Sequence, residues 1–360
     1  MKPHRLLLLP KYPPKAASSR LRTYQYLPFW EKQVGQVEIA PLLNQKYLQE
    51  LYAGNRISKF NVFKCYLRRL LILFSASRYD LLWVEKELFP FLLPVAEWLL
   101  SRTKGYMVDF DDAIFHNYDR SESPFVRHLM PRKIDRVMRY SKLVWAGNPY
   151  LMDRAHAAGA KRVCFLPTVI NPARYCVKTY SPNSVTCIGW IGSPTTQKYL
   201  QELLPVFESL HNQYPIRILL VNGKEALPFS GEMEVVPWTE DGEVEAILRM
   251  DIGIMPLPDS PWERGKCAYK LIQYMACGLP VVASPVGFNT TVVTHGQNGY
   301  LADTPESWQK HLTDLILHPE KREAMGKQGY LRVQESYTLE KNIERIREGL
   351  KLVDFLPTAP

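Results

Sequence analysis

One stretch, residues 251–287, constrains the fold of this chain more than any other. Its pattern predicts a strand over Asp251–Leu257, a loop over 258–265, a helix from Lys266 and a buried strand at Val281–Ala283. Apolar residues at steps of three and four define one face of that helix, and Gly278 is typical of a helix end. This order indicates an open α/β sheet with helices between parallel strands.

The predicted helix begins where open α/β sheets bind their ligands, and its amino end favours anions. Lys266 and Lys270 lie one turn apart there, and Gln273 follows on nearly the same side. Two ammonium groups and an amide suit a diphosphate and a sugar hydroxyl. Basic helix faces are also common on protein surfaces, so the spacing alone fits a solvated face equally well.

The string KLIQYMACGLPVVASPVG resembles the donor-binding core of the family-four retaining glycosyltransferases, which have the GT-B fold. The resemblance implies that Lys266 and Lys270 face the donor diphosphate and that Gln273 contacts the ribose. The family usually carries two glutamates eight positions apart, and here those positions hold Gly265 and Gln273. Glu263 lies two residues from the first position and is the candidate to compensate.

Length and composition favour a globular protein of two domains: 360 residues, 46% hydrophobic and 22% charged. The six cysteines have neither paired nor metal-ligand spacing, which indicates reduced thiols and a cytoplasmic protein. The apolar run after Lys2 is too short for a secretion signal and is expected to be the first strand. No apolar window has the length of a membrane span.

The net charge of +9 is concentrated in residues 1–102, which hold 16 Lys and Arg against 7 Asp and Glu. This asymmetry favours an anionic partner: a membrane surface, a lipid diphosphate or a nucleotide. Nucleic acid is not expected, because no nucleic-acid-binding motif accompanies the cations. Residues 56–75 predict a basic, apolar helix that could lie on an anionic bilayer at the inner membrane face, or pack as an ordinary helix.

The first half also carries polar residues where strands end. The first βα loop contains SSRLR, which resembles the family's acceptor-side loop, so Ser19 and Arg20, with Arg22, are candidates to meet a phosphate or an acceptor. A later strand ends at Asp109, Asp111 and Asp112, whose spacing also suits a metal ion. The resemblance instead places these aspartates on the acceptor side and implies no metal.

The second half is expected to open with a strand over Val185–Ile191 and a helix over 197–213. Glycines between them would let a ligand approach the backbone, and the helix start would offer free N–H groups. The candidate donor-binding residues there are Gly189, Gly192, Ser193, Thr195 and Thr196, with Lys198 as the family's lysine by resemblance. Gly287 lies next to the donor by resemblance, and Trp238 could flank the nucleobase or be an ordinary buried tryptophan.

The expected protein is therefore α/β, with two Rossmann-like, doubly wound domains facing a cleft. The first domain is expected over 1–168, a linker over 169–184, the second domain over 185–337, and residues 338–360 packing back on the first. The resemblance implies retaining transfer of a sugar from a nucleotide-diphosphate sugar, without a cofactor, to a saccharide or lipid-linked acceptor in cell-surface polysaccharide or glycolipid synthesis. A nucleotide-sugar 2-epimerase and a catalytically silent binding protein are the alternatives, because both family glutamates are absent.

Overall fold

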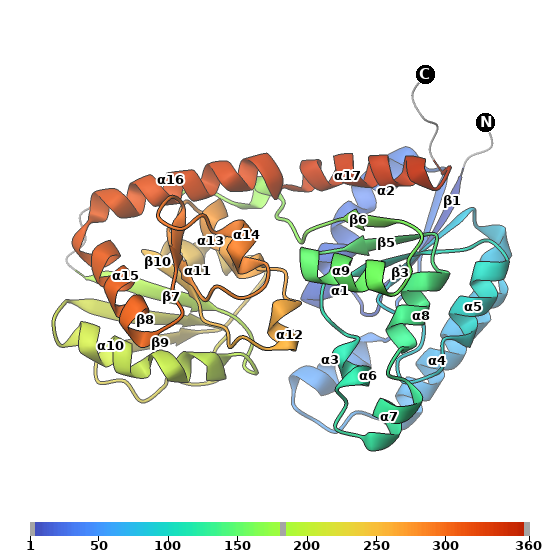
Figure 1. The fold of residues 1–360 in the computed structure, drawn as a ribbon, viewed down its shortest axis with the longest axis horizontal. Coiled ribbons are helices and arrows are strands. Elements are labelled where there is room, and N and C mark those ends of the chain that lie inside the picture. Colours follow the sequence, from blue (N-terminus) through green and yellow to red (C-terminus); the bar gives the residue numbers. More distant parts are fainter. Residues whose placement is uncertain (1–3, 181–184, 356–360) are drawn as a thin grey trace. The chain divides into compact units, whose positions relative to one another are not determined.

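The computed structural model describes residues 4–180 and 185–355. These residues form two six-stranded parallel sheets flanked by helices, with strand orders β2-β1-β3-β4-β5-β6 and β12-β11-β10-β7-β8-β9 (Figure 1). The first sheet consists of β1 (Arg5–Leu9), β2 (Gln36–Ile39), β3 (Leu81–Glu85), β4 (Met107–Phe110), β5 (Leu143–Ala146) and β6 (Val163–Phe165). The second consists of β7 (Thr186–Ile191), β8 (Ile216–Val221), β9 (Glu232–Val236), β10 (Ile252–Met255), β11 (Val281–Ala283) and β12 (Gly299–Leu301).

Central strands are buried along their whole length because helices cover both faces of a parallel sheet. Every residue of β3, β5 and β7 is buried. The α/β class expected from the sequence is confirmed, and the predicted strands agree with the observed ones to within a few residues.

The helices associated with the first sheet are α1 (Ala17–Arg22), α2 (Leu27–Gln33), α3 (Gln45–Tyr52), α4 (Lys59–Phe74), α5 (Val95–Arg102), α6 (His116–Asp119), α7 (Pro124–Leu129), α8 (Lys133–Tyr140) and α9 (Pro149–Ala157). Those of the second are α10 (Leu204–His211), α11 (Glu243–Leu248), α12 (Pro261–Arg264), α13 (Tyr269–Ala276), α14 (Asn289–Val292), α15 (Pro305–Leu317) and α16 (Pro319–Ser336). Helix α17 (Leu339–Leu352) follows.

Two helix predictions need correction. The segment predicted as one helix over 197–213 is a 3₁₀ helix, η4 (Gln197–Leu203), followed by α10, with a proline in the first turn of α10. The helix predicted from Lys266 begins only at Tyr269, because Ala268 is its N-cap and has a left-handed backbone with φ of 52°. The loop predicted over 258–265 contains the short helix α12.

The chain divides into two compact units. The first unit contains the chain up to Thr168, Gly265–Cys267 and the chain from Asn342 onward; the second contains Val169–Arg264 and Ala268–Lys341. The predicted linker over 169–184 is therefore not a separate segment as far as the structure describes it. Lys178 Nζ lies 2.9 Å from a carboxylate oxygen of Asp251, and Ile170 pairs with Thr338, so these residues belong to the second unit.

The last helix joins the first unit through its C-terminal part. Asn342 Nδ2 donates to Tyr26 Oη (2.8 Å) and to the carbonyl of Pro167 (2.7 Å). Gly349 faces the Trp145 ring, and a Cβ at that position would come within 2.1 Å of it. This is the return of the last helix to the first unit that the sequence led us to expect. Across the described ranges, no helix combines the length and apolar content needed to cross a bilayer.

Candidate functional site

In the second unit, a cation lies at the carboxyl end of β7. The Lys270 ammonium, in the first turn of α13, is 4.6 Å from the ring centre of Trp190. A Cβ on Gly192 would come within 2.8 Å of Lys270 Nζ and within 2.1 Å of the Trp190 ring, so only glycine fits at this turn. Asn222, directly after β8, donates to the Gly192 carbonyl (2.8 Å). The cation thus lies where open α/β sheets bind ligands, and it favours an anion.

The turn after β7 offers hydroxyl groups rather than free backbone N–H groups. Gly192 N donates to Val221 O (3.1 Å), and Ser193 N donates to Thr196 Oγ1 (3.1 Å). The N–H groups of Thr196 and Gln197 both donate to Ser193 O. The expectation of free N–H groups at this helix start is therefore wrong, because the tight turn satisfies them internally. The Ser193, Thr195 and Thr196 hydroxyls remain beside the turn, and Lys198 is exposed in η4.

Lys266 and Lys270 do not share a helix face. Lys266 precedes α13 and belongs to the first unit, where Asn148 Nδ2 donates to the carbonyls of Gly265 (2.8 Å) and Lys266 (3.1 Å). Cys267 Sγ donates to the carbonyl of Asp111 (2.6 Å). The predicted one-turn pair of lysines fails because α13 begins only at Tyr269, after the left-handed Ala268, so Lys266 lies outside the helix.

Gln273 belongs to a buried polar network of the second unit. Its Nε2 donates to Tyr175 Oη (3.2 Å), and Tyr175 donates in turn to Glu243 Oε1 (2.9 Å). The other oxygen of Glu243 accepts from Trp238 Nε1 (2.7 Å). Burial raises the pKa of Tyr175, which keeps its hydroxyl a donor. A single buried carboxylate therefore orients two of the candidate donor-binding side chains, Trp238 and Gln273.

Glu263 is buried in α12, and both of its carboxylate oxygens accept hydrogen bonds. Tyr199 Oη donates to Oε1 (2.5 Å), and Ser260 Oγ donates to Oε2. Burial, then the hydrogen bond with this carboxylate, raises the pKa of Tyr199. The hydrogen bond between Glu263 and Tyr199 therefore links α12 to η4.

Two candidate glycines have packing reasons of their own. A Cβ on Gly189 would come within 2.1 Å of the Met250 side chain, so this glycine makes room for the core. Gly287 has a φ of 54°, and a Cβ there would lie 2.5 Å from the carbonyl oxygen of Arg264. Neither observation requires a ligand.

In the first unit, Arg22 and Asp109 form a buried ion pair. Arg22 Nε donates to Asp109 Oδ2 (2.9 Å), and Nη2 donates to Oδ1. Arg22 Nη1 donates to the Leu166 carbonyl (2.8 Å). Arg22 was a candidate to meet a phosphate and Asp109 an acceptor-side group, but each is buried against the other. Arg20, half-buried in α1, is the arginine of this loop with an accessible side chain.

A second charged cluster joins the first βα loop to the ends of β3 and β4. Ser19 Oγ donates to Glu85 (2.7 Å), Ser18 Oγ donates to Asp111 (2.6 Å), and Lys86 Nζ lies 2.8 Å from Asp111. Burial alone would raise the pKa of Asp111, but Lys86 and Arg22 lower it to about 2. Burial raises the pKa of Glu85.

Asp112 is the aspartate of the predicted trio that reaches the surface, with its side chain 37% exposed. Burial and the Asp111 carboxylate raise the pKa of Asp112, while Lys86 and Lys266 oppose the rise. Because Asp109 and Asp111 already neutralise Arg22 and Lys86, the D-x-D spacing does not form a carboxylate cluster for a metal. Within residues 4–180 and 185–355, no group of three or more His, Cys, Asp or Glu side chains is arranged to hold one.

Several side chains of these sites were not singled out as candidates from the sequence. Tyr175 and Glu243 lie 68 residues apart, and no spacing rule connects them. Asn148 caps α9, where its Oδ1 accepts from Leu151 N, and its amide also donates to the carbonyls of Gly265 and Lys266. Lys86 directly follows β3, and the run of charges Glu85, Lys86 and Glu87 at a strand end was the available signal.

The chain has two units, each with a six-stranded parallel sheet, and the second carries a cation at a strand end. This architecture defines the class of protein, which is the GT-B fold. Solved structures with this fold align along nearly the whole chain. Sucrose-phosphate synthase from Thermosynechococcus elongatus has a TM-score of 0.72 at 12% identity, over 98% of this chain and 99% of that one. HepE of Anabaena, in complex with UDP and glucose, has a TM-score of 0.65 at 15% identity, over 97% and 99%.

Sequence comparison matches the second half of the chain to a family model. Residues 181–332 match the family model described as glycosyl transferases group 1. The D-inositol 3-phosphate glycosyltransferase of Segniliparus rotundus is 42% identical over 60 residues, 16% of this chain and 13% of that protein. The chain spans 13% to 15% of the length of the curated relatives it matches. The protein is thus of the GT-B fold, and its second half is similar to the glycosyl transferases group 1 family over residues 181–332.

Proposed function

We propose that this protein transfers a glycosyl group, with retention, from a nucleotide-diphosphate sugar to a saccharide or lipid-linked acceptor. The observation that carries the proposal is the Lys270 ammonium beside the Gly192 turn, inside the segment that matches the glycosyl transferases group 1 model. The UDP and glucose bound by HepE favour a uridine diphosphate sugar as the first donor to test. Cell-surface polysaccharide or glycolipid synthesis at the cytoplasmic membrane face is the setting we infer.

Lys270 would act on the leaving group. As the bond between the sugar carbon and the diphosphate breaks, negative charge builds on the phosphate oxygens, and a fixed ammonium stabilises that charge. The Ser193 and Thr196 hydroxyls would add hydrogen bonds to the same phosphates. Gln273, oriented by Tyr175, would meet the ribose, and Trp238, oriented by Glu243, would border the base.

On the first unit, we assign the acceptor to the surface that carries Ser19, Arg20 and Asp112. Asp112 is the half-exposed carboxylate there, and its raised pKa suits a hydrogen bond with a sugar hydroxyl. Lys266 lies in the same unit, and its charge acts on Asp112. We keep Lys266 as a candidate for the donor diphosphate and Glu263 as the residue that holds α12 in place.

The test begins with binding and then measures transfer. Thermal unfolding with UDP, GDP and ADP, each alone and with attached sugars, selects the donor; a ligand at 100 times its dissociation constant adds about 2.7 kcal/mol. Donor consumption is then followed with a panel of saccharide and lipid-linked acceptors, and NMR gives the configuration of the new bond. No binding of any nucleotide diphosphate would refute the proposal.

A catalytically silent binding protein is the second candidate, since both family glutamates are absent and both Glu263 oxygens are already hydrogen-bonded. Tight donor binding without release of the nucleoside diphosphate, over the whole acceptor panel, would favour it. Release of a free nucleotide-sugar isomer without any acceptor would instead indicate an epimerase.

A further inference from the structure

Helix α4 carries most of its large apolar side chains on the solvent side. Its fully buried residues are Asn61, Cys65 and Arg69, at steps of four, while Tyr66, Ile72 and Leu73 pack partly buried against the core. Arg69 Nη2 donates to the carbonyls of Pro10 and Ala40, both at 2.9 Å. Outward it exposes large apolar side chains at steps of three and four, some of them more than 60% exposed: Phe60, Phe63, Leu67, Leu70, Leu71 and Phe74. An apolar stripe on the solvent side indicates a partner.

The next helix also exposes large apolar side chains. Helix α5 buries Leu100 and Glu97, which accepts from Leu88 N (3.0 Å), and exposes Val95, Trp98 and Leu99. The Arg102 guanidinium lies 5.6 Å from the Trp98 ring centre. A tryptophan beside a cation is typical of side chains at the water–membrane boundary.

These side chains belong to one region of the first unit, at the lower right of Figure 1 where α4, α5 and α7 are labelled. Tyr66 of α4 donates to the Pro90 carbonyl (2.9 Å), and Phe91 N donates to Tyr118 Oη (3.0 Å), so contacts link α4 to the loop before α5. Of the 21 exposed large apolar side chains among the described residues, 16 lie between Leu51 and Leu129. We call this region the apolar face.

Positive charges predominate on and around α4 and α5. Residues 51–79 contain six Lys and Arg and no Asp or Glu. Glu97 is buried, so α5 presents no acid to solvent. If a second copy of this chain docked on this face, the cations of the two copies would repel each other. An anionic surface would instead complement these cations.

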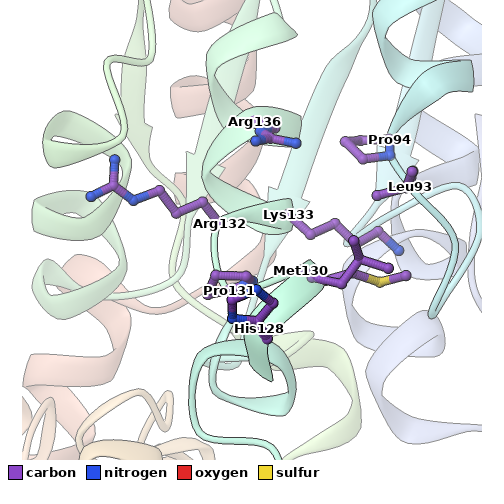
Figure 2. A pocket seen from close by; sticks show the side chains of 9 residues that line it. Leu93, Pro94, His128, Met130, Pro131, Arg132, Lys133 and Arg136 are labelled. Carbon is purple, nitrogen blue, oxygen red and sulfur yellow. The ribbon is translucent and has the colours of Figure 1, made fainter. Parts of the chain in front are cut away.

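A small cavity opens on the same region, between the loop before α5 and the start of α8. Figure 2 shows Leu93 and Pro94 on one side of it and His128 and Pro131 on the other. Its volume is about 130 Å³, several times that of a water molecule. The cavity is lined by Leu93, Pro94, His128, Leu129, Met130, Pro131, Arg132, Lys133 and Arg136.

The cavity combines apolar walls with cations and has no acidic residue in its lining. Lys133 Nζ is committed to Glu87 Oε2 (2.6 Å) and the Phe89 carbonyl. Arg132 and Arg136 are exposed, and neither forms an ion pair with any residue that the structure describes. A phosphate attached to an acyl-bearing group would match both the arginines and the exposed Leu93 and Leu129 at its edge.

We propose that the apolar face docks peripherally on an anionic phospholipid bilayer, with α4 lying along the membrane surface and a lipid phosphate held near Arg132 and Arg136. Apolar side chains on an interfacial helix enter the headgroup boundary, and the surrounding cations add electrostatic attraction. The docking goes beyond the proposed transfer reaction and does not depend on it.

The test is sedimentation of the purified protein with vesicles of phosphatidylcholine alone, or with roughly one third phosphatidylglycerol. We expect binding to the anionic vesicles and weak or no binding to the neutral ones. A Phe63→Ser, Leu67→Ser, Leu71→Ser variant should bind at least about tenfold more weakly, because its helix loses most of its outward apolar area. Arg132→Ala with Arg136→Ala should weaken binding by about fivefold for each cation removed.

Matched controls distinguish binding through the apolar face from non-specific binding to vesicles. Leu317→Ser with Leu331→Ser removes two exposed leucines from the second unit, and Lys161→Ala with Arg162→Ala removes two exposed cations from elsewhere in the first. Both controls should bind vesicles like the unmodified protein. Far-UV circular dichroism and nucleotide binding verify that every variant is folded.

Two results would overturn the proposal. One is equal binding of all variants to anionic vesicles, which would place the contact elsewhere. The other is self-association through this surface. In that case the unmodified protein would be a dimer in lipid-free buffer, the Phe63, Leu67 and Leu71 substitutions would convert it to a monomer, and neither protein would bind vesicles. Loss of sugar transfer with intact vesicle binding would refute the proposed function and leave the docking standing.

Discussion

The Arg22 guanidinium donates two hydrogen bonds to the Asp109 carboxylate in the interior of the first unit. The pair joins the first helix to the end of β4, and Arg22 also donates to the Leu166 carbonyl. Removing one partner leaves an uncompensated buried charge. We expect Asp109→Ala to lower the free energy of unfolding by about 3–5 kcal/mol, measured by urea denaturation.

Asp153, exposed in α9, provides the control for that substitution. Its alanine variant should unfold at nearly the same urea concentration as the unmodified protein. If Asp109→Ala also unfolded at the urea concentration of the unmodified protein, the buried Arg22–Asp109 pair would not stabilise the fold.

The stability of the first unit should depend on pH through Asp111. Burial opposes ionisation, but Lys86 and Arg22 outweigh it and lower the pKa of Asp111 to about 2. A carboxyl group with a lowered folded-state pKa stabilises the protein above its unfolded pKa of about 4, and this contribution disappears as the pH falls through about 2. The difference in unfolding free energy between the unmodified protein and Asp111→Asn should therefore shrink by roughly 2 kcal/mol between pH 7 and pH 2. Urea denaturation at several pH values measures it, and a constant difference would contradict the assignment.

Lys270 should govern turnover more than folding. Lys270→Ala removes the ammonium beside the Gly192 turn, and we expect turnover with the identified donor to fall by ~10²-fold or more. Lys327→Ala, an exposed lysine of α16, should behave like the unmodified protein. Steady-state kinetics with donor and acceptor at saturation measures both, and near-normal turnover of Lys270→Ala would remove Lys270 from the mechanism.

Glu243 should affect donor affinity through its neighbours. Glu243→Gln weakens the hydrogen bonds that orient Trp238 and Tyr175, and we expect the dissociation constant for the nucleoside diphosphate to rise about tenfold. Glu245 is exposed on the same helix, so Glu245→Gln is the matched control. Isothermal titration calorimetry measures the two constants. An unchanged constant in Glu243→Gln would place the base and ribose away from this network.

Gly326 should resist substitution even though it lies inside a helix. Alanine would gain about 1 kcal/mol of helix propensity, but its Cβ would lie 1.8 Å from the carbonyl oxygen of Gly278, at the end of α13. We expect a net loss of roughly 1–3 kcal/mol for Gly326→Ala. Gln328→Ala, on the exposed side of α16, should change the stability by less than about 0.5 kcal/mol. Thermal unfolding compares the two variants, and a Gly326→Ala protein as stable as the control would show that α16 can move away.

The sheets were predictable because strands such as Leu143–Ala146 are continuous apolar runs between clear breaks. The start of α13 was not, because nothing in the residues KCAYK marks Ala268 as left-handed, a conformation that alanine rarely adopts. That single backbone angle separates Lys266 from Lys270. The Tyr175–Glu243 contact and the burial of Arg22 against Asp109 also depend on tertiary packing, which local periodicity does not encode.

Helix α4 is held inward by Arg69 and by Tyr66, Ile72 and Leu73, which pack on the core, so its outer stripe contributes little to holding the fold together. Side chains such as Phe60 and Phe74 can therefore be exchanged for glutamate or lysine without dismantling the unit beneath them. In plain aqueous buffer the natural protein should adsorb to apolar vessel walls as its concentration rises. A mild detergent or a lipid nanodisc would cover the exposed apolar stripe of α4. A variant with glutamate or lysine at these positions is the better starting material for crystals.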